Sequence, residues 1–165
     1  MSIQLLTDTI DERWDGSADS VDGRRNDIPK PVNITAGSPN DRRKVSLKQG
    51  DAIFVYDGGE PTIEPKSVGW VEERIESKAT IDLYSAHSVE RVEGYRNDDG
   101  DLESYGGIKG EVKRILDDIR RGHKEFLMVI PSVYRYMHGD EPGGIYRGQW
   151  EVTLVQWNTI QQNTH

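Results

Sequence analysis

The chain has 165 residues, of which 34% are hydrophobic, and its mean hydropathy is -0.74. This length suffices for one domain with a real core, while the low apolar fraction predicts that much of the chain lies in polar loops. The absence of cysteine excludes disulfides, a thiolate nucleophile and a Cys-ligated metal. No run approaches the roughly 20 apolar residues of a membrane helix, and the first residues lack a signal-peptide pattern. We therefore expect a soluble protein made in the cytoplasm, with no membrane partner.

The net charge is -8, with 16 Asp against 13 Glu and 13 Arg against 8 Lys. The preference for Asp and Arg is typical of adaptation to high salt, and ordinary acidity explains it equally well. In either case, so negative a chain is a poor candidate for sequence-specific or general nucleic-acid binding.

The N-terminus is predicted to be an amphipathic helix over residues 2–14, ended by Asp15-Gly16. Its apolar residues recur at helical spacing: Ile3, Leu6, Ile10 and Trp14. Residues 15–50 are rich in Pro, Gly, Asn and Ser, which predicts a long arm. Because compact domains seldom contain structureless loops of this length, we expect the arm to bind something or to pack only in an assembly.

The arm also holds the basic concentration of the chain, with Asp27 and Asp41 as the opposing charges. The basic residues are Arg24, Arg25, Lys30, Arg42, Arg43, Lys44 and Lys48. One interpretation is a solvated loop attracted to the acidic body; another is a docking arm for an acidic protein surface. Nucleic-acid contact is a third, although no aromatic residue interleaves the basic ones to stack on bases. The candidate partner-binding residues are Arg24, Arg25, Arg42, Arg43 and Lys44.

The rest of the chain is predicted to form a sheet with one long helix. The expected strands cover residues 52–56, 70–75, 80–86, 126–137 and 146–157. The last two form a hairpin turned by Gly143-Gly144, and residues 158–165 form a polar tail.

A helix is predicted over residues 108–121, followed by Gly122 in a left-handed conformation. Its apolar stripe consists of Ile108, Val112, Ile115, Leu116 and Ile119. Charged residues, Glu111 among them, are expected on the solvated face. Ile115 and Leu116 should face the sheet near Val152 and Leu154.

The predicted fold class is therefore α+β: a mainly antiparallel sheet with the 108–121 helix and the N-terminal helix packed on one face. We expect a single domain over residues 1–157, with the arm at 15–50 as an appendage.

Motifs for chemistry are weak. The loop at 97–101 resembles part of a calcium site, but Tyr95 and Gly106 stand at two decisive ligand positions. Three glycines at the entrance of the long helix lack the spacing of a phosphate-binding loop. His138 lies near Asp140 and Glu141 without a second histidine at ligand spacing. The sequence thus indicates no catalytic residue, no metal and no cofactor, and points away from an enzyme.

The order of elements resembles that of the tail-terminator (tail-completion) proteins of long-tailed viruses. The resemblance covers roughly residues 50–157, and the first helix more loosely. It rests on the strand at 51–56, the edge strand at 79–84, the helix at 108–121 and the closing segment at 144–154. In that family the last strand commonly starts with an aromatic residue and an arginine after a Gly/Asp-rich turn, as Tyr146 and Arg147 do here.

The resemblance implies a structural protein of the virion that forms a hexameric ring in the neck. Such a ring caps the tail tube and joins it to the head-completion proteins, so the implied partners are other copies, the tail tube protein and a stopper or adaptor protein. With the charge balance, a virus of halophilic archaea would fit. The long arm departs from the family and leaves a head–tail adaptor or stopper open. A cellular enzyme or small-molecule-binding domain is a third alternative.

Overall fold

The protein, described here from a computed structural model, has an α+β fold with a mostly antiparallel sheet. The structure describes residues 2–37, 50–66, 72–124, 126, 128–137 and 145–159. The helices are α1 (Ser2–Glu12), the short 3-10 helix η1 (Ala18–Ser20), α2 (Val89–Glu93) and α3 (Gly107–Asp118). The strands are β1 (Asn33–Ala36), β2 (Ala52–Asp57), β3 (Thr62–Pro65), β4 (Glu72–Ser85), β5 (Met128–Met137) and β6 (Tyr146–Thr159).

The described strands form one six-stranded sheet in the order β1-β2-β4-β6-β5, with β3 pairing β4 off this path. The two 14-residue strands β4 and β6 pair antiparallel along their whole length and form the centre. The segment at 79–84, expected as an edge strand, is therefore central, since it pairs with β2 on one side and β6 on the other. On the other side of β4, β2 pairs with its second half and β3 with its first half. The pairing of β1 with β2 is parallel, and the remaining pairings are antiparallel.

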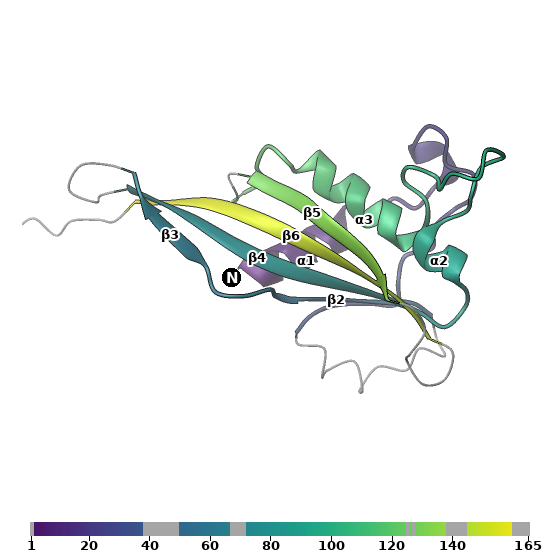
Figure 1. The fold of residues 1–165 in the computed structure, drawn as a ribbon, viewed down its shortest axis with the longest axis horizontal. Helices are drawn as coiled ribbons and strands as arrows, with labels where there is room; N and C mark the ends of the chain where they lie inside the picture. The colour runs from purple at the N-terminus through teal and green to yellow at the C-terminus, as the bar shows by residue number, and fades with distance from the viewer. Residues whose placement is uncertain are drawn as a thin grey trace, which may run out of the picture.

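The core lies between one face of this sheet and the helices, which gather on the same side in Figure 1. Strand alternation brings Ile81 of β4 and Val152 and Leu154 of β6 to this face. From α3, Ile115 and Leu116 are fully buried in the same cluster, as predicted. The opposite face carries no helix among the described residues, and a smaller cluster of Ala52, Phe54 and Tyr84 lies on it.

The predicted element boundaries differ from the structure in several places. The strands predicted at 70–75 and 80–86 are parts of one strand, β4, and β6 continues to Thr159, into the predicted tail. The helix predicted over 108–121 ends at Asp118, and Gly122 follows with φ 111°. β1, β3 and α2 were not predicted. The turn at Gly143-Gly144 lies outside the described residues, as do residues 160–165.

The N-terminal helix ends at Glu12, two residues before the predicted end, because Trp14 turns towards the segment that follows. Its indole Nε1 donates to the carbonyl of Ile28 at 3.1 Å, and Ile28 belongs to the core with 5% exposure. Residues 15–37 are therefore packed on the domain rather than extended as an arm. The rest of the predicted arm, residues 38–49, lies outside the described residues.

Truncating the α3 stripe should destabilise the fold. We expect Ile115→Ala or Leu116→Ala to cost about 2–5 kcal/mol of unfolding free energy, because each leaves a cavity in a fully buried site. Urea unfolding followed by circular dichroism measures this cost. Asp118→Ala at an exposed position of the same helix is the control and should change stability by less than about 0.5 kcal/mol. Equal effects at the three positions would contradict this packing.

Candidate functional site

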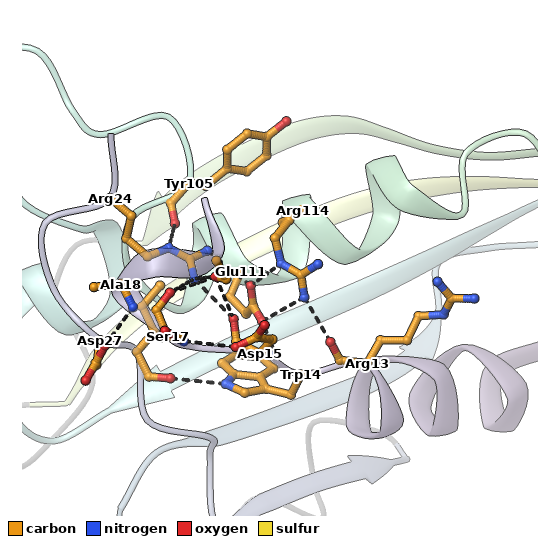
Figure 2. Close-up of polar contacts among 12 residues, drawn as sticks. Arg13, Trp14, Asp15, Ser17, Ala18, Arg24, Asp27, Tyr105, Glu111 and Arg114 are labelled. Carbon is orange, nitrogen blue, oxygen red and sulfur yellow. Dashed lines mark hydrogen bonds and ion pairs between the residues drawn. The ribbon is translucent and has the colours of Figure 1, made fainter. Parts of the chain in front are cut away.

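A buried carboxylate, Glu111 of α3, lies at the centre of a polar cluster that joins the N-terminal segment to the helix (Figure 2). We call Asp15, Arg24, Glu111 and Arg114 the clasp. Glu111 has no exposed surface, although the sequence placed it on the solvated face of the helix. Four donors explain its burial, since a charge in the interior requires partners for its lone pairs.

Two arginines supply three of these four bonds. Arg24 Nη2 donates to Glu111 Oε1 at 3.1 Å. Arg114 donates through Nε to Oε1 at 2.6 Å and through Nη2 to Oε2 at 3.0 Å, the two-pronged geometry favoured by guanidinium and carboxylate. This hydrogen-bonding raises the pKa of Arg114 above its ordinary value. The fourth donor is the backbone N–H of Asp15, 2.6 Å from Oε2.

Each nitrogen of the Arg24 guanidinium donates a hydrogen bond within the chain. Its Nε donates to the carbonyl of Tyr105 at 3.1 Å. Its Nη1 reaches the oxygens of the preceding turn, namely Asp15 O, Ser17 O and Ser20 Oγ. Since the side chain is also fully buried, the structure commits this predicted partner-binding residue to the fold.

The other predicted partner-binding residues are placed differently. Arg25 is 45% exposed, with Asp98 at 3.6 Å and Glu103 at 4.0 Å. Arg42, Arg43 and Lys44 lie outside the described residues. The structure therefore separates Arg24 from Arg25, two neighbours that the sequence grouped together.

A cavity of about 450 Å³ lies beside residues 26–29, in the segment that follows Arg24. Its polar lining includes Asp27, His87, Glu90, Arg91, Tyr95 and Glu103. Glu103 is 8% exposed, and its Oε1 accepts no hydrogen bond from the described residues. Three carboxylates in one lining suit a cationic group. No group of three His, Cys, Asp or Glu side chains in the described part of the chain is arranged to hold a metal ion.

The motif-like segments from the sequence form no site. In the loop at 97–101, Asn97 Oδ1 accepts the backbone N–H groups of Asp99 and Asp101 at 3.0 and 2.9 Å, so this oxygen closes a turn. His138, Asp140 and Glu141 lie outside the described residues.

A second buried carboxylate, Asp82, lies on the helix-free face of the sheet with no exposed surface. Its Oδ2 accepts Tyr56 Oη at 3.0 Å, Tyr84 Oη at 3.3 Å and Arg147 Nη2 at 3.0 Å, and its Oδ1 accepts Gln149 Nε2 at 2.9 Å. These donors come from β2, β4 and β6, so the cluster links the three central strands. The sequence predicted a strand at 80–86, but it did not reveal which residues of other strands meet Asp82 and Tyr84.

Comparison with known proteins adds no family. No protein-family model matches the sequence, and no curated protein matches it. None of the helices in the described part of the chain is long and apolar enough to cross a membrane.

The edge strand β5 is a candidate binding surface. Among the described strands it pairs only with β6. On the helix-free face its side chains form a row that is apolar apart from Arg135, which lies between Val133 and Met137. The exposed apolar members of this row are Met128 by 38%, Val133 by 39% and Met137 by 36%, and Arg135 is exposed as well. Such a row on an edge strand is a surface to which another chain can bind.

Breaking the clasp should release the N-terminal segment. Arg24→Ala leaves the Glu111 carboxylate buried with one fewer cation, and we expect a cost of about 3–5 kcal/mol in unfolding free energy. Amide hydrogens of residues 15–28 should then exchange faster than those of β4. Lys30→Ala, which removes a surface pair with Asp11, is the control and should cost less than about 1 kcal/mol. An unchanged exchange pattern in the Arg24 variant would show that the clasp does not hold the segment.

The Asp82 cluster predicts a loss of stability in alkali. Burial, and then the negative charge of Asp82, raises the pKa of Tyr56 above its ordinary value near 10. The folded state thus holds the phenol proton more tightly than the unfolded state does. This contribution is complete below about pH 10 and is lost as pH rises towards the folded pKa.

Tyr56→Phe should therefore show a shallower decline of unfolding free energy above about pH 10, measured by urea titrations at a series of pH values. Tyr95→Phe, at a position 48% exposed, corrects for the loss of one tyrosine. Parallel declines in the wild type and in Tyr56→Phe would contradict the assignment.

Proposed function

We propose that the chain is a structural subunit of a viral neck, which assembles into a ring, caps the tail tube and joins it to the head-completion proteins. The observation that carries the proposal is the exposed apolar row on β5. In a chain of net charge -8, apolar side chains at a sheet edge favour contact with another protein. The order of elements that resembles the tail terminators supplies the kind of assembly.

The chemistry of the buried carboxylates also supports a structural role. Glu111 and Asp82 each accept four hydrogen bonds from the chain itself. A carboxylate whose lone pairs are occupied in this way binds its own protein rather than a substrate. We therefore propose a non-enzymatic protein, located in the virion after synthesis in the host cytoplasm.

Within the neck, a head–tail adaptor or stopper would use the same kind of self-association. The long predicted arm raised this alternative, because it departs from the tail terminators. That departure is smaller than the sequence suggested, because residues 15–37 pack on the domain. The tail terminator therefore remains our first proposal.

One observation favours a different class, a small-molecule-binding domain. The cavity beside Glu103 has the size of a ligand site, and a buried carboxylate lines it. Native mass spectrometry tests the neck proposal against this class, since a neck subunit must assemble into a ring and a small-molecule-binding domain need not.

The assembly prediction is specific to the apolar row. The wild type should form a closed oligomer of about six copies by native mass spectrometry, and ring-shaped particles by electron microscopy. Val133→Asp places a charge within the row and should shift the mass towards the monomer, because burying an unpaired charge in an interface costs several kcal/mol. Gln4→Asp, at an exposed position of α1, is the control and should assemble normally.

Wild-type protein that stays monomeric at all concentrations would overturn the proposed function. The place in the virion has its own test. Immunogold labelling of particles of the virus that encodes the chain should mark the junction of head and tail. Label along the whole tail, or on the capsid alone, would contradict a neck protein.

A further inference from the structure

The sheet ends in strand β1 on one side and in strand β5 on the other, and we infer that these two edges join copies of this chain. We propose that β5 of one copy pairs antiparallel with β1 of the next, so that the sheet continues head to tail from copy to copy. This inference rests on the proposed self-assembly and names the surfaces that carry it. Among the described strands, neither the outer side of β5 nor that of β1 has a partner.

The register of the sheet aligns the two edges. One row across the strands runs through Asn33, Ala52, Tyr84, Arg147 and Met137. A second row ends at Ala36 on the β1 edge and at Tyr134 on the β5 edge. The four residues of β1 are therefore level with residues 134–137 of β5. A neighbour displaced sideways, without a shift along the strands, brings the two edges together.

Strand direction agrees with this pairing. β1 runs parallel to β2, and the three pairings from β2 through β4 and β6 to β5 are antiparallel. β1 and β5 consequently run in opposite directions. A copy placed sideways offers an antiparallel partner, with a hydrogen-bonding pattern slightly more stable per residue than the parallel one.

The first half of β5 is less suited to pairing than the second. Val129 N–H already donates to the carbonyl of Arg120 at 3.1 Å. Pro131 lacks an N–H, and the register shifts between Pro131 and Val133. Residues 134–137 thus form the regular part of the edge, and their number matches the length of β1.

Charges on the two edges are complementary. The turn before β5 exposes Arg120, Arg121 and Lys124. The opposite side of the sheet exposes Glu60 before β3 and Glu64 on β3, where Glu64 also pairs with Lys66 of its own chain at 3.2 Å. Through the pairs of Met128 with Val155, Val155 with Glu76 and Glu76 with Thr62, β3 is level with the start of β5. The same sideways displacement therefore brings the basic turn towards Glu60 and Glu64.

A two-fold dimer through β5 alone fits less well. Antiparallel pairing of residues 133–137 with themselves would place Arg135 opposite its own copy, and like charges directly opposite destabilise a strand pair. A heterologous contact, in contrast, uses two different surfaces and closes into a ring when the rotation allows it. The occupant of the β5 edge is therefore the β1 edge of a second copy.

Paired charge reversals test the inference in the full chain. Variant A carries Arg120→Glu and Arg121→Glu, and variant B carries Glu60→Lys and Glu64→Lys. Each alone should raise the concentration of half-assembly by about tenfold, because like charges then meet at every contact. An equimolar mixture of A and B, and a chain carrying all four changes, should both recover the ring, as measured by sedimentation velocity and native mass spectrometry.

The backbone pairing has a separate readout. Amides of residues 33–36 and 134–137 should gain protection from hydrogen exchange when the wild type assembles, whereas amides of the α2 helix should not. A ring that forms but leaves these amides unprotected, or a four-change chain that fails to assemble while retaining its circular dichroism spectrum, would overturn the inference and leave the proposed function standing. A wild type without any ring would overturn the proposed function itself. A mixture that yields only a one-to-one dimer would show a two-fold contact instead.

Discussion

The ion pair between Arg24 and Glu111 is the interaction on which the arrangement of the N-terminal third depends. Both side chains are fully buried, so neither charge can be solvated by water if the other is absent. The pair joins residues 87 positions apart and fixes the turn at 15–24 against α3. With that turn in place, Ile28 reaches the core and the chain is delivered to β1 at the sheet edge. The clasp therefore contributes to placing β1 beside β2.

The Asp82 cluster favours one register of the central strands on the other face of the sheet. A strand pair that slipped by one residue would move every side chain to the opposite face. In such a slip Asp82 would lose donors from β2 and β6 at once, which penalises the wrong register heavily. The two buried carboxylates thus have different structural roles. Glu111 positions a segment that is rich in glycine and polar residues, and Asp82 fixes the register of the strands beside which that segment packs.

The sequence predicted the elements whose side chains repeat with a regular period. The apolar stripe of α3 and its place against Val152 and Leu154 of β6 were predicted correctly, because α3 is long enough to show a helical period. The sequence did not reveal how residues 15–37 are held on the domain, since their position depends on one arginine and one glutamate far apart in the chain. Glu111 lies among charged residues on its helix, and no local pattern distinguishes it from its exposed neighbours. β1 and β3 have four residues each, too few for a periodic signal.

The fold and the proposed assembly use interactions that respond differently to salt. The clasp and the Asp82 cluster are buried, so salt reaches them weakly, whereas the basic turn before β5 and the acidic residues near β3 are exposed and are screened beyond about 10 Å at 0.1 M salt. The apolar row on β5 contributes an attraction that screening does not remove. Changes at the edges should therefore weaken or redirect the proposed contact between copies while each subunit keeps its core. The proposed ring would depend on this separation, because each domain must fold before it meets its neighbours.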